Sequence, residues 1–125
     1  MVQQAANTVI SESVNEAQLD PFPLSPEQVI EGNPQASAKL IWVSDDGRQA
    51  SGIWECTPGT FNYSHTNETA GVIAGKATIT PEGGEPIEIG PGSIVFFAEG
   101  SQTHWVVEET VRKAFHLQAD GGLGL

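Results

Sequence analysis

The stretch from Trp54 to Lys113 reads WECTPGTFNYSHTNETAGVIAGKATITPEGGEPIEIGPGSIVFFAEGSQTHWVVEETVRK, and it decides the fold. Its β-branched and aromatic residues come in short runs, and each run ends at a cluster of turn-forming residues. Short strands separated by turns at regular intervals are typical of a β-sandwich or a barrel. The predicted strands are residues 38–44, 49–56, 60–64, 69–73, 77–80, 86–89, 93–97, 103–107 and 110–117.

The chain has 125 residues, which is the length of one domain with a single core. We predict a flexible N-terminal tail at residues 1–20, a single domain at residues 21–117 and a C-terminal tail at residues 118–125. Within the domain, Asp45–Arg48 and Pro81–Gly84 are hairpin signals, and Gly75 interrupts a strand-like run. The composition therefore favours an all-β domain.

The charge and the cysteine count exclude several functions. The chain carries 16 acidic and 5 basic residues, for a formal net charge of -11. Such a charge repels nucleic acid and anionic lipid, so we expect neither a nucleic-acid partner nor a membrane partner. Cys56 is the only cysteine and has no base beside it, so we expect a buried structural thiol and cytoplasmic residence.

A series of short motifs resembles a known family. GIWECTPGTF occupies residues 52–61, six residues separate Glu68 from Gly75, Trp105 follows soon after Gly100, and VRK occupies residues 111–113. In this order they resemble the small cupins that include the cupin domain of ureidoglycine aminohydrolase, over residues 30–117. The resemblance implies an all-β cupin double-stranded β-helix, or jelly-roll barrel, with a short irregular N-terminal segment.

Cupins of this kind bind a metal through three histidines and one glutamate, and the resemblance implies where these ligands would stand. The histidine places of the first motif fall on Asn62 and Ser64, or on Phe61 and Tyr63 with a longer spacing. The histidine place of the second motif is Thr103. Only Glu68 matches the ligand set, so we predict no metal and no other cofactor.

Two histidines lie one position away from these places. A shift of one residue in a strand turns a side chain to the opposite face, so His104 points outward if Thr103 and Trp105 point inward. His65 borders a short connection, where strand alternation can fail. A divalent metal held by His65, Glu68 and His104 is the alternative, and ordinary surface or rim histidines are the favoured interpretation.

Glu68 has two interpretations. In the barrel mouth its carboxylate could bind an amine or act as an acid or base, whereas in a structural role it would pair with Arg112 or Lys113. We predict a ligand pocket around it, and no catalytic residue can be identified. The predicted pocket residues are Asn62, Tyr63, Ser64, Glu68, Thr103 and Trp105.

The predicted function is the binding of a small polar molecule in the barrel mouth, without the usual cupin metal. The alternative is a metal-dependent hydrolase or related enzyme that acts on a small nitrogenous, ureide-like compound, so whether the protein is an enzyme stays open. The resemblance also implies a homodimer, for which exposed strand edges give a physical motive.

Overall fold

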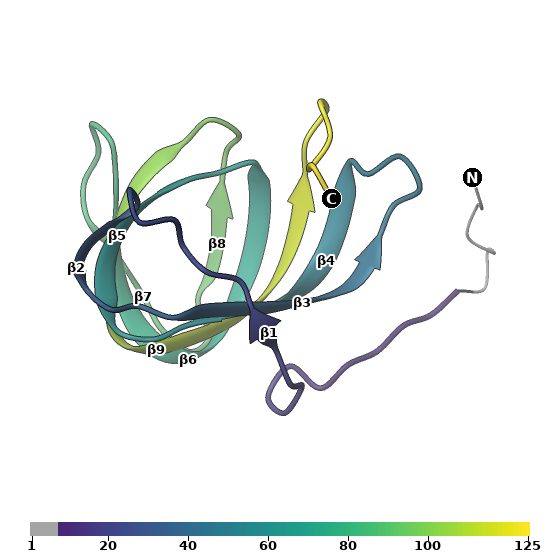
Figure 1. Cartoon of the computed structure of the whole chain (residues 1–125), viewed down its shortest axis with the longest axis horizontal. Coiled ribbons are helices and arrows are strands. Elements are labelled where there is room, and N and C mark those ends of the chain that lie inside the picture. Colours follow the sequence, from purple (N-terminus) through teal and green to yellow (C-terminus); the bar gives the residue numbers. More distant parts are fainter. Residues whose placement is uncertain (1–7) are drawn as a thin grey trace.

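The computed structural model describes residues 8–125, in which every regular element is a β-strand and all strand pairs are antiparallel (Figure 1). The predicted all-β cupin barrel is confirmed. No helix in this part of the chain is long and apolar enough to cross a membrane. The strands are β1 (Asp20–Pro21), β2 (Val29–Gly32), β3 (Ala36–Val43), β4 (Gln49–Cys56), β5 (Gly59–Ser64), β6 (Asn67–Pro81), β7 (Ile87–Ile89), β8 (Ile94–Phe97) and β9 (Gln102–Gln118).

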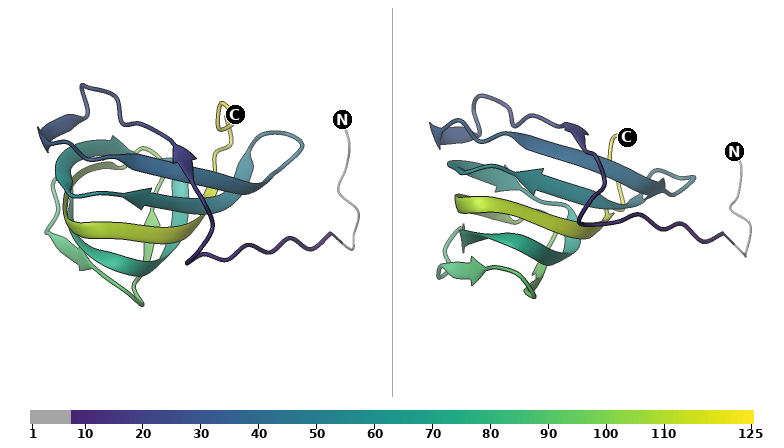
Figure 2. Two further views of the ribbon diagram at one scale, coloured as in Figure 1. Left: turned by 60° about the horizontal axis from the view of Figure 1, so that its bottom comes forward. Right: turned by 90° about the horizontal axis from the view of Figure 1, so that it is seen from below.

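Two long strands, β6 and β9, run through both halves of a curled sheet. In one half, β9 lies between β5 and the second part of β6, and β2 and β7 extend this half outward. In the other half, β9 lies between β4 and the first part of β6, and β3 and β8 extend it. Figure 2 shows how the strands lie side by side and curve around a common interior. The jelly roll is therefore two half-sheets joined by two shared strands.

The bend of β6 lies at Gly75, where the pairing with β9 shifts register between Val72 and Ala77. Gly75 has a φ of 91°, which is a left-handed conformation. A Cβ atom at this position would stand 2.1 Å from the carbonyl oxygen of Thr110. The prediction that Gly75 ends a strand was therefore wrong, because β6 bends there and continues. Likewise, the two predicted strands at 103–107 and 110–117 form the single strand β9.

The interior is filled by aromatic side chains and small apolar residues. Trp105 and Phe61 are almost fully buried and stack with ring centroids 5.6 Å apart, and Trp54 meets Trp105 edge-on at 5.7 Å. Cys56 is also fully buried, and burial raises the pKa of its thiol to about 12. The thiol therefore stays protonated at neutral pH, in agreement with the structural role predicted for it.

Both terminal segments lie on the barrel. The Arg112 guanidinium donates hydrogen bonds to the carbonyl oxygens of Val14 at 2.6 Å and Ala17 at 2.5 Å, and it pairs with Glu55. The first seven residues of the predicted tail lie outside the described residues. The predicted irregular lead-in also contains the short strands β1 and β2. At the other end, the backbone N–H of Leu123 donates to the carbonyl oxygen of Gly47 at 2.9 Å.

Candidate functional site

An ion pair lies inside the mouth of the barrel. Glu68 is near the start of β6 and Lys113 is on β9, and both side chains point inward. The Lys113 Nζ atom donates to Glu68 Oε2 at 2.5 Å. Only 6% of the Lys113 side chain and 7% of the Glu68 side chain are exposed. Because two opposite charges are desolvated together, each depends on the other for its stability in the interior.

Aromatic rings surround the ammonium group of Lys113. Its Nζ atom lies 4.7 Å from the ring centroid of Trp54, 5.3 Å from that of Trp105 and 5.4 Å from that of Phe97. A cation over aromatic faces is attracted by the negative potential of the rings. The rings therefore stabilise the positive charge, although they supply no hydrogen-bond acceptor as strong as an oxygen.

The pair determines the charge state of Glu68. Burial by itself would raise the pKa of the carboxyl group, but the Lys113 ammonium, with a smaller contribution from His65, lowers the pKa to about 2. Glu68 is therefore ionised at neutral pH. A carboxylate in this state accepts hydrogen bonds and is a poor source of protons, so the structure does not support the role of general acid for it.

We expect this pair to make stability depend on pH. The folded-state pKa of about 2 lies below the ordinary value of 4.5, so the contribution of Glu68 is complete above pH 4.5 and is lost as the pH falls toward 2. Such a shift corresponds to about 3 kcal/mol in the free energy of unfolding. Urea unfolding across this pH range measures it. Glu68→Gln should flatten the dependence, and an identical dependence in this variant would contradict the assignment.

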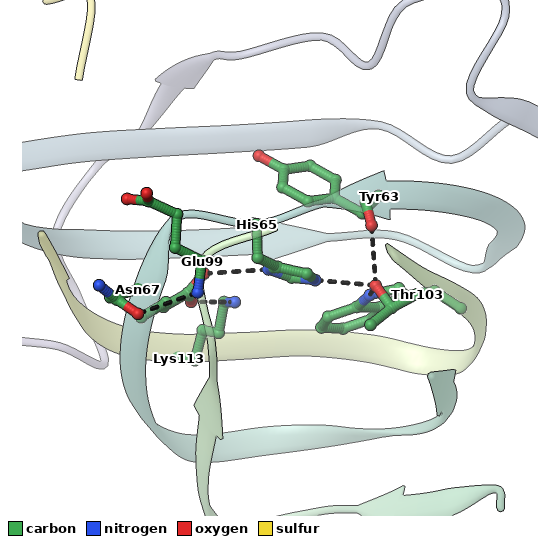
Figure 3. A network of polar contacts seen from close by, with 8 residues as sticks. Tyr63, His65, Asn67, Glu99, Thr103 and Lys113 are labelled. Carbon is green, nitrogen blue, oxygen red and sulfur yellow. Dashed lines mark hydrogen bonds and ion pairs between the residues drawn. The ribbon is translucent and has the colours of Figure 1, made fainter. Parts of the chain in front are cut away.

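His65 is held beside this pair by a hydrogen-bond chain (Figure 3). The Thr103 hydroxyl donates to the carbonyl oxygen of Tyr63 at 3.0 Å and accepts from Trp105 Nε1 at 3.0 Å. His65 Nε2 lies 2.8 Å from the same oxygen. Because the only hydroxyl proton is used on the Tyr63 carbonyl, Nε2 of His65 must be the donor in this contact.

The other ring nitrogen of His65 has no hydrogen-bond partner among the described residues. It lies 3.6 Å from Glu68 Oε1, which is too long for a direct hydrogen bond. The ring is also fixed by stacking on Phe97, with centroids 3.9 Å apart and planes 6° apart. His65 is thus a rigid part of the site whose Nδ1 atom faces a carboxylate.

Glu68, His65 and Thr103 form a series of carboxylate, imidazole and hydroxyl groups like that of a nucleophilic triad. The geometry of their contacts does not support nucleophilic catalysis. In a triad the hydroxyl gives its proton to the histidine and faces the substrate. Here the hydroxyl of Thr103 gives its proton to a backbone carbonyl and accepts from the histidine. Thr103 is 5% exposed and is not part of the wall of the main cavity. We therefore assign Thr103 a positioning role for His65 and Trp105.

The barrel mouth contains a cavity of about 390 Å³. Its walls come mainly from apolar and aromatic side chains, and ionisable groups come from the Glu68–Lys113 pair, His65, Tyr63 and Asp20. The C-terminal residues Leu123 and Leu125 also contribute to its wall. Burial raises the pKa of the Tyr63 hydroxyl, which therefore stays a neutral phenol. The remaining lining residues are Pro21, Phe22, Ala38, Leu40, Trp54, Phe61, Ser64, Thr66, Trp105, Phe115 and Leu117.

The structure brings four of the six predicted pocket residues to this cavity, and the two others to a second hollow. Tyr63, Ser64, Glu68 and Trp105 line the main cavity. The second hollow, of about 330 Å³, is lined by residues that include Asn62, Thr103 and His104. There the side chain of Asn62 is exposed and its Oδ1 lies 3.0 Å from His104 Nδ1. Because Asn62 and His104 alternate with Tyr63 and Trp105, they face the other side of their strands.

The three predicted metal-site residues do not converge. His104 faces the second hollow, while Glu68 and His65 face the main cavity. Within residues 8–125, no group of three His, Cys, Asp or Glu side chains could hold a metal ion. The Lys113 ammonium also lies against the carboxylate that would be a ligand. A cupin metal therefore does not fit the donor atoms of this site.

Sequence reasoning placed His65 at the surface or rim, and this was wrong, because the residue is 6% exposed. Its backbone N–H donates to the carbonyl oxygen of Ser101, which continues the extended pairing beyond the end of β5. The sequence suggested Lys113 only as a structural partner of Glu68, whereas in the structure its side chain also lines the cavity. Phe61 and Tyr63 point inward, and the alternation of a strand places His65, two residues further on, on the same side.

An antiparallel jelly roll with a cavity at its mouth is an architecture that the cupins share with other jelly-roll proteins. Residues 43–115 match the family model described as the EutQ-like cupin domain. Since the match spans more than half of the chain, the protein belongs to the EutQ-like cupin family. A search of curated proteins found no significant match.

Solved structures support this assignment. A protein of unknown function from the DUF861 family of Pseudomonas syringae pv. tomato is 26% identical with a TM-score of 0.73, covering 82% of this chain and 45% of its own. The present chain thus spans less than half the length of that relative. A Thermotoga maritima DUF861 protein is 38% identical, with a TM-score of 0.51 and coverages of 52% and 75%. Clostridium difficile EutQ is 22% identical, with a TM-score of 0.60 and coverages of 75% and 78%, which is a likeness of fold alone.

Proposed function

We propose that the protein binds a small molecule in the barrel mouth, with the polar end of the ligand against the Glu68–Lys113 pair. The observation that carries the proposal is a cavity of about 390 Å³ that contains a buried ion pair. This volume is at the small end of the range for ligand sites, which are mostly apolar with a few polar groups that orient the ligand. The cavity has this composition.

The charges of the site favour a ligand with an uncharged polar head. In the buried part of the cavity Lys113 already balances the charge of Glu68, and Asp20 contributes its carboxylate only from the exposed strand β1. A charged head beside the pair would therefore add an unbalanced charge to an interior walled by aromatic rings. A hydroxyl head can donate to Glu68 Oε1 without changing this balance. Trp54, Phe115 and Leu117 offer apolar surface to the body of such a ligand.

The tryptophans provide a direct test. Trp54 and Trp105 line the cavity, whereas Trp42 stacks on His116 outside it, with centroids 6.4 Å apart. We expect benzyl alcohol to shift the indole N–H signals of Trp54 and Trp105 in an NMR titration and to leave that of Trp42 unchanged. Benzoate and benzylammonium, which carry the same ring, should bind more weakly. Equal shifts of all three signals would indicate unspecific binding.

The role of Glu68 is tested by the same titration. Glu68→Gln should weaken binding of benzyl alcohol about tenfold, because a hydrogen bond to a charged acceptor is replaced by one to a neutral amide. Glu99 is exposed and outside the cavity, so Glu99→Gln is the matched control and should bind as the unaltered chain does. An unchanged affinity in Glu68→Gln would mean that Glu68 has only a structural role.

The alternative function is a metal-dependent hydrolase for a ureide-like compound, which the resemblance to the cupin domain of ureidoglycine aminohydrolase implies. The close approach of His65 Nδ1 to Glu68 Oε1, at 3.6 Å, favours it. The Lys113 ammonium and the orientation of His104 oppose it. Elemental analysis of protein purified without chelator separates the two functions. A near-stoichiometric metal that is lost in His65→Ala would favour the hydrolase.

A further inference from the structure

The mouth of the main cavity is bordered by exposed apolar side chains. Phe22 is 52% exposed, Leu40 is 40% exposed and Leu125 is 64% exposed, and all three line the cavity that contains the Glu68–Lys113 pair. We call these three side chains the apolar rim. Single exposed apolar residues are common, but several around one opening mark a surface that binds something. A polar head at the buried pair leaves this rim unexplained.

All three members of the apolar rim are attached to the same strand. Leu40 belongs to β3, and the backbone N–H of Phe22 donates to the carbonyl oxygen of Ala36, at the start of β3, at 2.9 Å. The segment that carries Leu125 is attached to the turn between β3 and β4 by the backbone hydrogen bond of Leu123. The apolar rim is therefore the β3 side of the mouth.

Strand register shows what lies between the buried pair and the apolar rim. Lys113 on β9 is opposite Trp54 on β4. Two residues further along β9, Phe115 is opposite Gly52, and Gly52 is opposite Leu40 of the rim. Because inward-facing residues recur at every second position, this second row adjoins the first on the cavity side of the sheet. The wall therefore leads from the ammonium group to the rim through side chains that carry no charge.

The polar groups at the mouth restrict what the outer part of a ligand can be. Ser64 lines the cavity at the end of β5, but its hydroxyl already donates to Gln102 Oε1 at 2.6 Å. Asp20, on β1, adds an exposed carboxylate, which would repel a ligand whose outer end is anionic. A cationic end would gain little from it, since one exposed carboxylate is well solvated. The outer part of the ligand is therefore apolar and uncharged.

The size of the cavity also indicates a chain instead of a very small molecule. Its volume of about 390 Å³ has room for at least about a dozen groups of the size of a water molecule. A short alcohol with its hydroxyl group at Glu68 would leave the outer wall and the apolar rim without contacts. An alkyl chain of medium length reaches further and buries apolar surface on both.

We propose that the ligand of this site is a medium-chain primary alcohol, whose hydroxyl group donates to Glu68 Oε1 and whose alkyl chain leaves the cavity over the apolar rim. This inference rests on the proposed function, to which it adds the chemical class of the ligand. It explains why the same cavity has ionisable groups in its buried part and exposed apolar side chains at its opening.

A series of alcohols tests the proposal, with the indole signals of Trp54 and Trp105 as the readout of an NMR titration. From 1-butanol through 1-hexanol to 1-octanol, the affinity should rise about fourfold for each added methylene group. Octanoate, which carries a charged head on a chain of similar length, should bind more weakly than 1-octanol. Equal affinities for 1-butanol and 1-octanol would overturn this inference and leave the proposed function standing. The absence of any shift with all three alcohols would overturn both.

Variants of the apolar rim locate the chain. Phe22→Ser and Leu125→Ser should each lower the affinity for 1-octanol about fivefold, because they remove apolar contact outside the barrel, and should leave the affinity for 1-butanol unchanged. Both residues are exposed, so neither change disturbs the core. Ile94→Ser is the matched control, since Ile94 is 80% exposed on β8 and does not line the cavity. It should bind both alcohols as the unaltered chain does.

The same variants distinguish an alkyl chain from another occupant of the rim. A second copy of the chain, as in the homodimer predicted from the resemblance, is the main alternative. Light scattering of the unaltered chain and of both rim variants measures their mass. A change in mass without a change in the affinity for 1-octanol would mean that a second copy covers the rim, and it would overturn the proposal. Equal losses of affinity for 1-butanol and 1-octanol would overturn it as well.

Discussion

Replacing Lys113 by methionine is expected to lower the free energy of unfolding by about 3–5 kcal/mol. Methionine matches lysine in length as far as the Cε atom and is apolar, so the packing of the stem against Trp54 and Phe97 is largely retained. The Glu68 carboxylate, whose side chain is 7% exposed, would then be a buried charge without its partner. Urea unfolding at neutral pH measures the loss.

The double variant Glu68→Gln with Lys113→Met separates the cost of an orphaned charge from the value of the pair. A buried pair replaced by neutral groups of similar size is often neutral in stability. We therefore expect the double variant to recover most of the loss. A loss below about 1 kcal/mol in Lys113→Met alone would show that the pair is as weak as an exposed salt bridge.

Gly75→Ala is expected to cost about 3 kcal/mol or more, because two penalties add at one position. The φ of 91° is a conformation that residues with a Cβ rarely adopt, and such backbone strain costs about 1–3 kcal/mol. The new Cβ would also stand 2.1 Å from the carbonyl oxygen of Thr110 and 2.6 Å from the Cα of Val111. Both neighbours are backbone atoms of β9, so relief requires the two long strands to separate.

Gly83→Ala is the matched control for this change. Gly83 has a φ of 77° in the turn between β6 and β7, and a Cβ there meets no atom within 4 Å. It therefore carries the cost of the conformation without the clash, about 1–2 kcal/mol. Thermal or urea unfolding measures the loss in the free energy of unfolding for each variant. The difference between the two losses is the cost of the clash. Equal losses would show that β9 moves away without cost.

Most strands could be predicted from the sequence, because their turns carry strong signals. The hairpin at Asp45–Arg48 joins β3 to β4, and Pro81–Gly84 leads from β6 to β7, as expected. The continuity of β6 through Gly75 could not be predicted, since a glycine that bends a strand and one that ends it look alike in a single sequence. The difference depends on the approach of β9, which is a tertiary contact.

Part of the site could be predicted from the alternation of side chains along the strands. The outward orientation of His104 was made conditional on Thr103 and Trp105 facing inward, and the low exposures of these two residues show that the condition holds. Lys113 has the same parity along β9, so alternation alone would have placed it inside if 103–107 and 110–117 had been recognised as one strand. His65 extends the inward series of Phe61 and Tyr63 in the same way. The partner of His65 Nε2 could not be predicted, because it depends on the register between β5 and β9.

The sharing of β6 and β9 by both half-sheets has a consequence for how the protein reaches its folded state. Neither half can close without a strand that also belongs to the other, so we infer a single cooperative unfolding transition. The partners of β9 are β4, β5 and β6, all of which precede it by many residues. Proteins dominated by such distant pairings fold slowly, in milliseconds to seconds. Among the strands of the described residues, β9 is thus the one that completes both half-sheets at once.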